Sequence, residues 1–385
     1  MSDQSAQKSE RADEREARAR GAAYWMQAAI ERARGATVRS SPNPRVGCVV
    51  VRDGVMIGAG HSAPAGGAHA EVQALAEAGE GARGAQLFVT LEPCSHWGRT
   101  PPCVDAILKA GVSEVYFGLV DPDERVQGRG AAMLRAAGVQ VTEGLLREAC
   151  ERLHAPFLSR IRRGRPWVSL KGAMSLDGQL ATANGDSQWI TGLPARQHVH
   201  QLRAQVDAVL VGGGTARADL PQLTVRHCPG EDPLPVVLSR RLELPSVLPL
   251  IRPGAIFFHG PEAPADARRA LSEVGARCRE LPLDAQGRCA LPQLLEELAA
   301  LGVNHLLVEG GGETHGAFLA AQLADDLYLY LAPKLIGQGR PLFAFPSPER
   351  LRDAHQLEPF ELTPLGDDLL LYSRFRRHQA RAQGE

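Results

Sequence analysis

The strongest chemical signal in this chain is a histidine followed two residues later by a glutamate, with two cysteines further along. These residues are His69, Glu71, Cys94 and Cys103. One imidazole and two thiolates can hold zinc, and catalytic zinc keeps three protein ligands so that water fills the fourth position. The metal lowers the pKa of that water, and a neighbouring carboxylate can take the proton and return it. We therefore expect Glu71 to be the catalytic proton carrier in the hydrolytic removal of an exocyclic amine from a heterocycle.

The spacing matches the H-x-E and P-C-x-x-C signature of zinc-dependent nucleobase deaminases, with one departure. Cys94 and Cys103 are separated by eight residues instead of two. The extra residues form a loop over the metal, in which His96 and Arg99 could contact an anionic substrate. Two other interpretations stay open: the cysteines are ordinary buried thiols, or a structural zinc is closed by His61 or His96.

A helix entry must position the histidine and the glutamate. Side chains two residues apart do not share a helix face. His69 and Glu71 can therefore converge on one metal only where the chain is still turning into a helix. Gly66 and Gly67 allow that turn, and residues 71–78 are typical of the helix that follows.

The cysteines are expected at the ends of two further elements. Cys94 follows a predicted strand over residues 86–90, and Cys103 opens a predicted helix over residues 104–110. Unpaired N–H groups at a helix N-terminus favour the charged form of a thiol. Asn43, held between two prolines, could read a pyrimidine edge or could be a turn residue.

Apolar strands and amphipathic helices alternate on both sides of the motif. Strands are expected over residues 46–51, 55–60, 115–119 and 139–142, and helices from residue 21, over 130–137 and over 145–153. This alternation predicts a sheet that helices cover on both faces.

Length and composition narrow the class of protein. A chain of 385 residues favours two domains. The formal net charge of −1 lacks the basic footprint of a nucleic-acid enzyme, so we expect a small-molecule substrate and no nucleic acid. No apolar run is long enough to span a membrane. Seven cysteines without framework spacing suit a reducing cytoplasm.

The expected domain limits follow from two segments of unusual composition. Residues 1–20 carry five basic and five acidic side chains and predict a solvated, disordered tail. Residues 160–166 are basic and contain Gly and Pro, which is typical of a linker. We therefore expect a zinc-dependent domain over residues 21–160 and a second domain over residues 166–380.

The second domain shows polar segments at the ends of its predicted strands. Two of them are rich in glycine: residues 212–215 and residues 309–316, the latter after a predicted strand over 304–308. A Gly-rich turn between a strand and a helix can present N–H groups to a phosphate. One such turn is equally typical of a tight turn, but two in one domain favour a dinucleotide site.

Motifs in both halves resemble those of the bifunctional riboflavin-biosynthesis deaminase/reductase family, from about Tyr24 to Phe375. The motifs are PNPRVG at 42–47, HAE at 69–71, EPCSHWGRTPPC at 92–103, SLDG at 175–178, SQWI at 187–190 and VEGG at 308–311. The long segment between the two cysteines is itself specific to that family among zinc deaminases.

The resemblance implies two successive reactions. The first domain would be cytidine-deaminase-like, with three α/β/α layers, and would deaminate 2,5-diamino-6-ribosylamino-4(3H)-pyrimidinone 5′-phosphate with one zinc ion. The second would be a dihydrofolate-reductase-like α/β domain that uses NADPH to reduce the ribosyl chain of 5-amino-6-(5-phosphoribosylamino)uracil to ribityl. The implied partner is a pyrimidine ribosyl phosphate, and a homo-oligomer is left open.

The resemblance also implies roles for individual residues. His69, Cys94 and Cys103 would hold zinc, and Glu71 would be catalytic. Substrate would bind Ser187, Arg203, Leu223, Arg226 and Glu309. NADPH would bind Ala173, Trp189, Thr215, Asp219, Ser239, Gly311, Gly312, Glu313, Thr314, His315, Gly316 and Ala317. Arg203 and Arg226 could grip a phosphate through paired N–H donors, although either could be a surface ion pair.

Some positions depart from the family pattern. Leu220 follows Asp219 where a second acid is usual, and His154 replaces Asn. Asp123 and Glu124 replace the usual Asn-Pro. Two rival functions remain: a deaminase of free nucleobases or nucleosides with a non-catalytic second half, and a binding module with a structural zinc.

Overall fold

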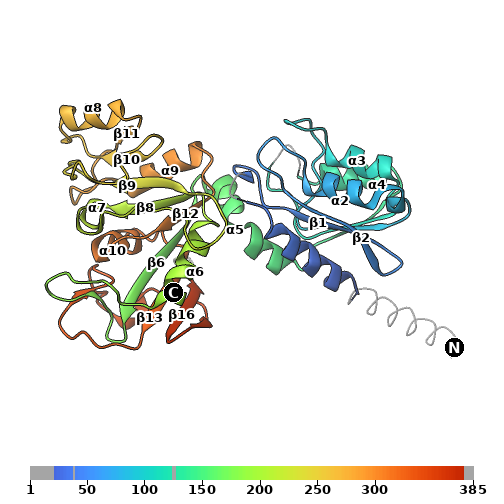
Figure 1. The fold of residues 1–385 in the computed structure, drawn as a ribbon. Coiled ribbons are helices and arrows are strands. Elements are labelled where there is room, and N and C mark those ends of the chain that lie inside the picture. Colours follow the sequence, from blue (N-terminus) through green and yellow to red (C-terminus); the bar gives the residue numbers. More distant parts are fainter. Residues whose placement is uncertain (1–20, 38–39, 124–126, 377–385) are drawn as a thin grey trace, which may run out of the picture. The chain divides into compact units, whose positions relative to one another are not determined.

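The computed structural model describes residues 21–37, 40–123 and 127–376 (Figure 1). The predicted tail over residues 1–20 and the departure at Glu124 lie outside these ranges. The chain divides into two compact units, residues 1–163 and 164–385. Within the described ranges, no helix is long and apolar enough to cross a membrane.

The first unit contains a five-stranded sheet in the order β2-β1-β3-β4-β5. β1 is antiparallel to β2 and β3, whereas β3, β4 and β5 are parallel. A helix over residues 21–33 precedes the sheet. The other elements are β1 (Gly47–Arg52), β2 (Val55–His61), α2 (Ala70–Ala78), η2 (Gly79–Ala82), β3 (Gln86–Val89), α3 (Cys103–Ala110), β4 (Glu114–Phe117), α4 (Arg129–Ala136), β5 (Gln140–Glu143) and α5 (Arg147–Arg163).

Alternating side chains bury both faces of this sheet, because successive residues of a strand point to opposite sides. Cys48 and Val50 of β1 pack with α2, α3 and α4, whereas Val49 and Val51 pack with the helix over 21–33 and with α5. Figure 1 shows these two groups of helices on opposite faces of the sheet. The predicted three-layer α/β/α arrangement is confirmed.

Helix α5 is longer than the sequence predicted. It runs through Pro156 and ends at Arg163, so the first part of the expected linker is helical. Phe157 and Leu158 are buried against the sheet, and this packing extends the helix beyond the predicted end. Gly164, at φ +66°, follows the last helical residue, and only glycine takes that conformation without strain.

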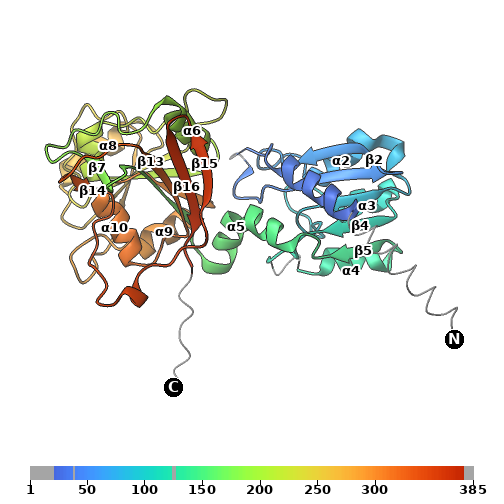
Figure 2. The same cartoon turned by 90° about the horizontal axis from the view of Figure 1, so that it is seen from below.

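The second unit contains a nine-stranded sheet in the order β11-β10-β9-β8-β12-β6-β13-β16-β15 and a two-stranded sheet of β14 and β7. Figure 2 labels the strands β13, β16 and β15 at one edge of the large sheet. The strands from β11 to β13 are parallel, and β16 and β15 close the edge with antiparallel pairs. The first elements are β6 (Trp167–Ser175), β7 (Gln179–Ala181), α6 (Leu193–Arg203), β8 (Ala208–Gly212), α7 (Gly213–Asp219), β9 (Leu234–Leu238), β10 (Ile256–His259) and α8 (Ala265–Glu273). The remainder are β11 (Arg277–Glu280), α9 (Leu291–Ala300), β12 (His305–Val308), α10 (Gly312–Ala320), β13 (Asp326–Ala332), β14 (Arg340–Pro341), η3 (Leu351–Asp353), β15 (Glu361–Leu365) and β16 (Asp368–Arg374).

Helices cover both faces of the large sheet, as in other α/β folds with parallel strands. Residues of α9 and α10 pack on one face, and residues of α6, α7 and α8 pack on the other. Because the strands from β9 to β6 are parallel, their carboxyl ends lie along one edge of the sheet. Ligands of open α/β sheets bind at that edge.

Candidate functional site

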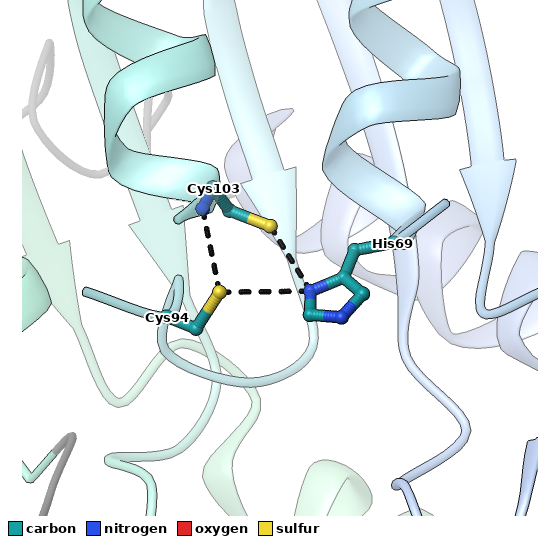
Figure 3. Close-up of side chains that lie close together, drawn as sticks. All are labelled: His69, Cys94 and Cys103. Atoms are coloured by element: carbon teal, nitrogen blue, oxygen red, sulfur yellow. Dashed lines mark hydrogen bonds between the residues drawn. The ribbon is translucent and has the colours of Figure 1, made fainter. Parts of the chain in front are cut away.

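His69, Cys94 and Cys103 come together in the first unit (Figure 3). Their potential ligand atoms all lie within 4.8 Å of one another. His69 Nδ1 lies 3.2 Å from Cys103 Sγ and 3.6 Å from Cys94 Sγ. The three side chains thus enclose one point from three sides, although they come from separate segments of the chain.

The ends of two helices position these side chains. His69 is the N-cap of α2, which places Glu71 in its first turn. Cys103 is the first residue of α3, and its backbone N–H donates to Cys94 Sγ at 3.3 Å. The helix entry predicted for His69 and Glu71 is therefore present, as is the helix opening at Cys103.

The donor set fits zinc. Tetrahedral zinc with the usual Zn–S and Zn–N lengths would separate neighbouring ligand atoms by about 3.5–3.8 Å, close to the observed spacing. In the described part of the chain, neither His61 nor His96 belongs to a group that could hold a metal. A site with three ligands and no fourth is the kind that keeps a position for water.

The two cysteines differ in the direction of their pKa shifts. Hydrogen bonds from Cys103 and His69 lower the pKa of Cys94, which favours its thiolate form. The hydrogen bond to Cys94 and burial raise the pKa of Cys103. Metal ligands must be deprotonated, so binding of zinc would release the proton of Cys103.

Glu71 lies beside the three ligands and is buried. Burial and the neighbouring thiolate of Cys94 raise the pKa of Glu71 to about 7. A general base is most effective when its pKa lies near the working pH, because it can then both accept and return a proton. The position and pKa of Glu71 both suit the proton transfer that the sequence predicted.

A cavity of about 480 Å³ opens in front of this group. Such a volume is sufficient for a small ligand. The residues discussed for substrate contact all line it: Asn43, His96 and Arg99. Asp121 and Arg160 add further charged groups to the wall. Asn43 therefore lies on the cavity, as expected of a residue that reads a pyrimidine edge.

Glu92 has a positioning role that the sequence did not reveal. Its buried carboxylate accepts N–H groups from Asp121 at 3.2 Å, Gly128 at 2.9 Å and Ala131 at 3.1 Å. It thereby caps α4 and fixes the segment that continues into Cys94. A glutamate two residues before a metal-binding cysteine was the only sequence signal for this role.

His154, a departure from the family pattern, is part of the core. It is buried, and its Nε2 lies 3.1 Å from Thr90 Oγ1. Burial lowers the pKa of His154 to about 4, so the ring is neutral. Thr90 also accepts the backbone N–H of Gly47 at 3.2 Å. His154 therefore connects α5 to two strands and is not a cavity residue.

In the second unit, an arginine and a glutamate predicted to face substrate form a buried ion pair. Arg203 Nε and Nη2 donate to Glu309 at 2.6 and 2.9 Å, and Nη1 donates to the carbonyl of Thr224 at 3.0 Å. Burial alone would raise the pKa of Glu309, but the Arg203 guanidinium lowers it to about 2. Three N–H donors of Arg203 are thus engaged by the protein, and contact of Arg203 with a phosphate stays a prediction.

Lys171, in β6, lies near this ion pair, and the sequence analysis did not single it out. Burial lowers the pKa of Lys171, whereas the carboxylate of Glu309 opposes that shift. Its ammonium lies 5.7 Å from the ring centroid of Tyr330, within the range of a cation–π contact. A lysine in the middle of a largely buried strand was the signal that could have identified it.

The two Gly-rich turns lie side by side, because β8 and β12 are neighbours in the sheet. Thr215 Oγ1 accepts the backbone N–H of Gly311 at 3.0 Å and so joins the turns. A Cβ on Gly212 would collide with Thr314, and one on Gly213 would lie 2.8 Å from Ser239 Oγ. The glycines therefore let three segments predicted to bind the dinucleotide approach one another.

Some other residues predicted to bind substrate or NADPH have buried side chains. The side chain of Leu223 is buried in the core, and that of His315 is fully buried with Nε2 3.3 Å from the carbonyl of Val308. Both could meet a ligand only through their backbone. Gly316 packs against the backbone of Ala344, where a Cβ would not fit.

The remaining predicted positions lie at or near the surface. Trp189 is 61% exposed, and the Arg196 guanidinium lies 4.1 Å from its ring centroid. Arg226 is exposed and donates to Gln222 Oε1 at 2.9 Å. Ala173 lies in β6, Ser187 lies between β7 and α6, and Asp219 is the last residue of α7.

Comparisons with known proteins match both units. Residues 20–119 match the family model described as the cytidine and deoxycytidylate deaminase zinc-binding region. Residues 166–371 match the model described as the RibD C-terminal domain. The two matches fall on opposite sides of the division between the units.

Relatives also match nearly the whole length of the chain. The chain is 40% identical to riboflavin biosynthesis protein RibD of Bacillus amyloliquefaciens, over 90% of this chain and 95% of that one. Its identity to RibD of Escherichia coli is also 40%, over 91% and 98% of the two chains.

Solved structures agree over the full length. Acinetobacter baumannii RibD superposes with a TM-score of 0.83 at 37% identity, covering 93% of this chain and all of that one. A diaminohydroxyphosphoribosylaminopyrimidine deaminase/5-amino-6-(5-phosphoribosylamino)uracil reductase from Thermotoga maritima gives 0.81 at 33% identity, with coverage of 93% and 100%. With the zinc-type donor set in one unit and the RibD C-terminal fold in the other, this chain belongs to the RibD family of bifunctional deaminase/reductases of riboflavin biosynthesis.

Proposed function

We propose that the first unit hydrolyses the 2-amino group of 2,5-diamino-6-ribosylamino-4(3H)-pyrimidinone 5′-phosphate, and that the second unit reduces the deaminated product with NADPH. The T. maritima relative carries both activities in its name. The observation that carries the proposal is the three-ligand group beside the buried carboxylate of Glu71. A closed four-ligand site would not support hydrolysis.

In the deaminase unit, His69, Cys94 and Cys103 would hold zinc, which when bound makes water acidic enough to be a nucleophile near neutral pH. Glu71 would take a proton from the attacking water and would deliver it to the departing amine. The overall exchange replaces a C–NH₂ group and water by a C=O group and ammonia. Asn43 would pair with the pyrimidine edge, and Arg99 would meet the phosphate, since both line the cavity.

In the reductase unit, the first carbon of the ribosyl group would accept a hydride from bound NADPH. The bond from that carbon to the ring oxygen would break and the oxygen would take a proton from solvent, which leaves an open ribityl chain. The expected cofactor residues gather at the carboxyl ends of β6, β8, β9 and β12, where Thr215 and Gly311 are joined. Arg203 keeps Glu309 ionised and oriented toward the substrate. Arg226, whose guanidinium is exposed, would meet the substrate phosphate.

The setting of this chemistry would be the cytoplasm. All seven cysteines are free thiols, a state that a reducing compartment maintains. The substrate would be a free pyrimidine ribosyl phosphate, because a formal net charge of −1 gives no overall excess of positive charge to attract nucleic acid.

The direct test is to incubate the purified chain with the diaminopyrimidine phosphate and NADPH while ammonia and NADPH oxidation are followed together. We expect ammonia release without NADPH, and NADPH oxidation only after deamination. Cytosine, cytidine and guanine serve as alternative substrates in parallel. Ammonia from one of these but not from the ribosyl phosphate would favour a deaminase of free bases or nucleosides and would overturn the proposal.

A further inference from the structure

The second ring nitrogen of His69 has a hydrogen-bonding partner that the proposed chemistry does not use. Thr100 Oγ1 lies 3.2 Å from His69 Nε2, on the side of the ring away from the sulfurs. Nδ1 faces both Cys94 and Cys103. The imidazole is therefore held at both nitrogens, by prospective ligands on one side and by a hydroxyl on the other.

The chemistry of a metal-bound imidazole fixes what this hydroxyl must do. A neutral imidazole that gives the lone pair of Nδ1 to a metal carries its proton on Nε2. That N–H needs an acceptor, and outer partners of this kind orient the ring and raise its basicity. Thr100 Oγ1 can accept the bond. Being uncharged, it adds no negative charge beside two thiolates and a buried carboxylate.

The loop between the cysteines explains how Thr100 reaches this position. Thr100 stands three residues before Cys103, and Pro101 and Pro102 fill the interval. Proline has a fixed φ, so the offset between the hydroxyl and the thiol is stiff. The backbone N–H of Gly98 donates to the carbonyl of Thr100 at 3.2 Å and closes the turn on the other side.

We propose that Thr100 is a positioning residue that fixes the tautomer and orientation of His69 for zinc, and that the long cysteine-to-cysteine loop exists partly to supply it. The inference rests on the proposed zinc-dependent function of this site. A two-residue spacer between the cysteines would leave no room for such a residue ahead of Cys103. The loop thus contributes to the histidine ligand as well as to the second cysteine ligand.

The test compares Thr100→Val, which keeps the shape but loses the acceptor, with Thr100→Ser, which keeps the hydroxyl. The first readout needs no substrate: the rate at which the zinc-loaded protein loses metal to a chelator at neutral pH. Loss of an outer partner typically costs 10–100-fold in metal affinity, so we expect Thr100→Val to release zinc about 10–100-fold faster. Thr100→Ser should stay near the parent rate.

A second readout is the visible spectrum of the cobalt-substituted protein, which reports ligand geometry. Thr100→Val should shift these bands, and Thr100→Ser should restore them. Circular dichroism is the folding control for the first unit, and reductase activity on deaminated substrate should not change in either variant. If Thr100→Val folds poorly, Thr100→Ala against Thr100→Ser gives the same contrast at smaller volume.

Two results would overturn the inference. One is equal zinc release from the parent, Thr100→Val and Thr100→Ser. The other is equally fast release from Val and Ser, which would mean that the methyl group or the loop shape matters and the hydroxyl does not. A parent chain that binds no zinc at all would instead overturn the proposed function, so the two failures are distinguishable.

Discussion

The two candidate sites are built in different ways. In the first unit, one short stretch from His69 to Cys103 supplies every ligand and the proton carrier, and two helix N-termini aim them. In the second unit, Lys171, Arg203 and Glu309 meet only because β6 and β12 are neighbours and α6 ends beside them. Substitution of one ligand should therefore abolish the activity of the first site, because all its parts depend on one metal ion. Substitutions in the second site, which is spread over several strands, should each reduce its activity only in part.

The largest effect is expected for Cys103→Ser. A neutral hydroxyl replaces a charged soft ligand, so zinc and deaminase activity should both be lost, while reductase activity on deaminated substrate continues. Cys150→Ala is the matched control, since Cys150 is a buried thiol of the same unit outside the donor set. Metal analysis of both variants decides the matter, and full zinc content in Cys103→Ser would refute the ligand assignment.

The next effect concerns Glu71→Gln, which keeps the size of the side chain but cannot accept a proton. Loss of general acid–base catalysis typically costs about 10²–10⁴ in rate, and deamination should fall at least that far. Zinc should stay bound because Glu71 is not a ligand. Glu77→Gln, at an exposed position of the same helix, should leave both activities intact. The idea of two separate sites is falsified if Glu71→Gln slows both reactions equally.

In the second unit, Glu309→Gln should leave the charge of Arg203 buried without its partner. Breaking a buried pair by removing one member typically costs about 3–5 kcal/mol, so the second unit should unfold at lower denaturant. Zinc content and deamination should not change. Glu262→Gln removes one side of the exposed pair with Arg240 and should shift the denaturation midpoint little. Equal shifts in the two variants would show that the Arg203 pair is no more important than a surface pair.

The smallest effect is expected in the pH dependence of the stability of the first unit. His154 titrates near 6.5 in an unfolded chain but near 4 in the folded one, so the unfolded chain binds more protons between these values. Stability of the first unit should therefore fall as the pH drops from 6.5 toward 4, by on the order of 3 kcal/mol at most.

His154→Asn, the residue usual in the family, should flatten that part of the first unit's profile. The second unit should keep its acid sensitivity, because burial also lowers the pKa of His200 and His315 to about 4. Urea unfolding at several pH values, followed separately for each unit, measures both profiles. An unchanged slope in His154→Asn would mean that other groups dominate the acid response of the first unit.

The sequence alone predicted the ligand group of the first unit, but it did not predict the side-chain contacts of the second unit. The spacing of His69, Glu71, Cys94 and Cys103 predicted the ligand group, because local elements alone decide where those side chains point. The bond from Thr100 to His69 and the role of Glu92 were missed, since both depend on how a loop folds back.

In the second unit, only the strand order reveals the contacts. Nothing in the sequence shows that Glu309 lies beside Arg203. Lys171 was missed for the same reason. The length of α5 was also underestimated, since burial of Phe157 and Leu158 extends the helix through a proline that argues locally against it. The assignments of individual residues to NADPH stay predictions.

The bond between Thr215 and Gly311 divides the backbone amides at the start of α10 into two kinds. The Gly311 amide is already hydrogen-bonded, so it should exchange slowly with deuterated solvent whether or not nucleotide is present. The amides of Gly312, Glu313 and Thr314, in the first turn of α10, can have no acceptor within the helix. Their exchange should slow when an anion binds them, so this short stretch would report the binding of the proposed cofactor.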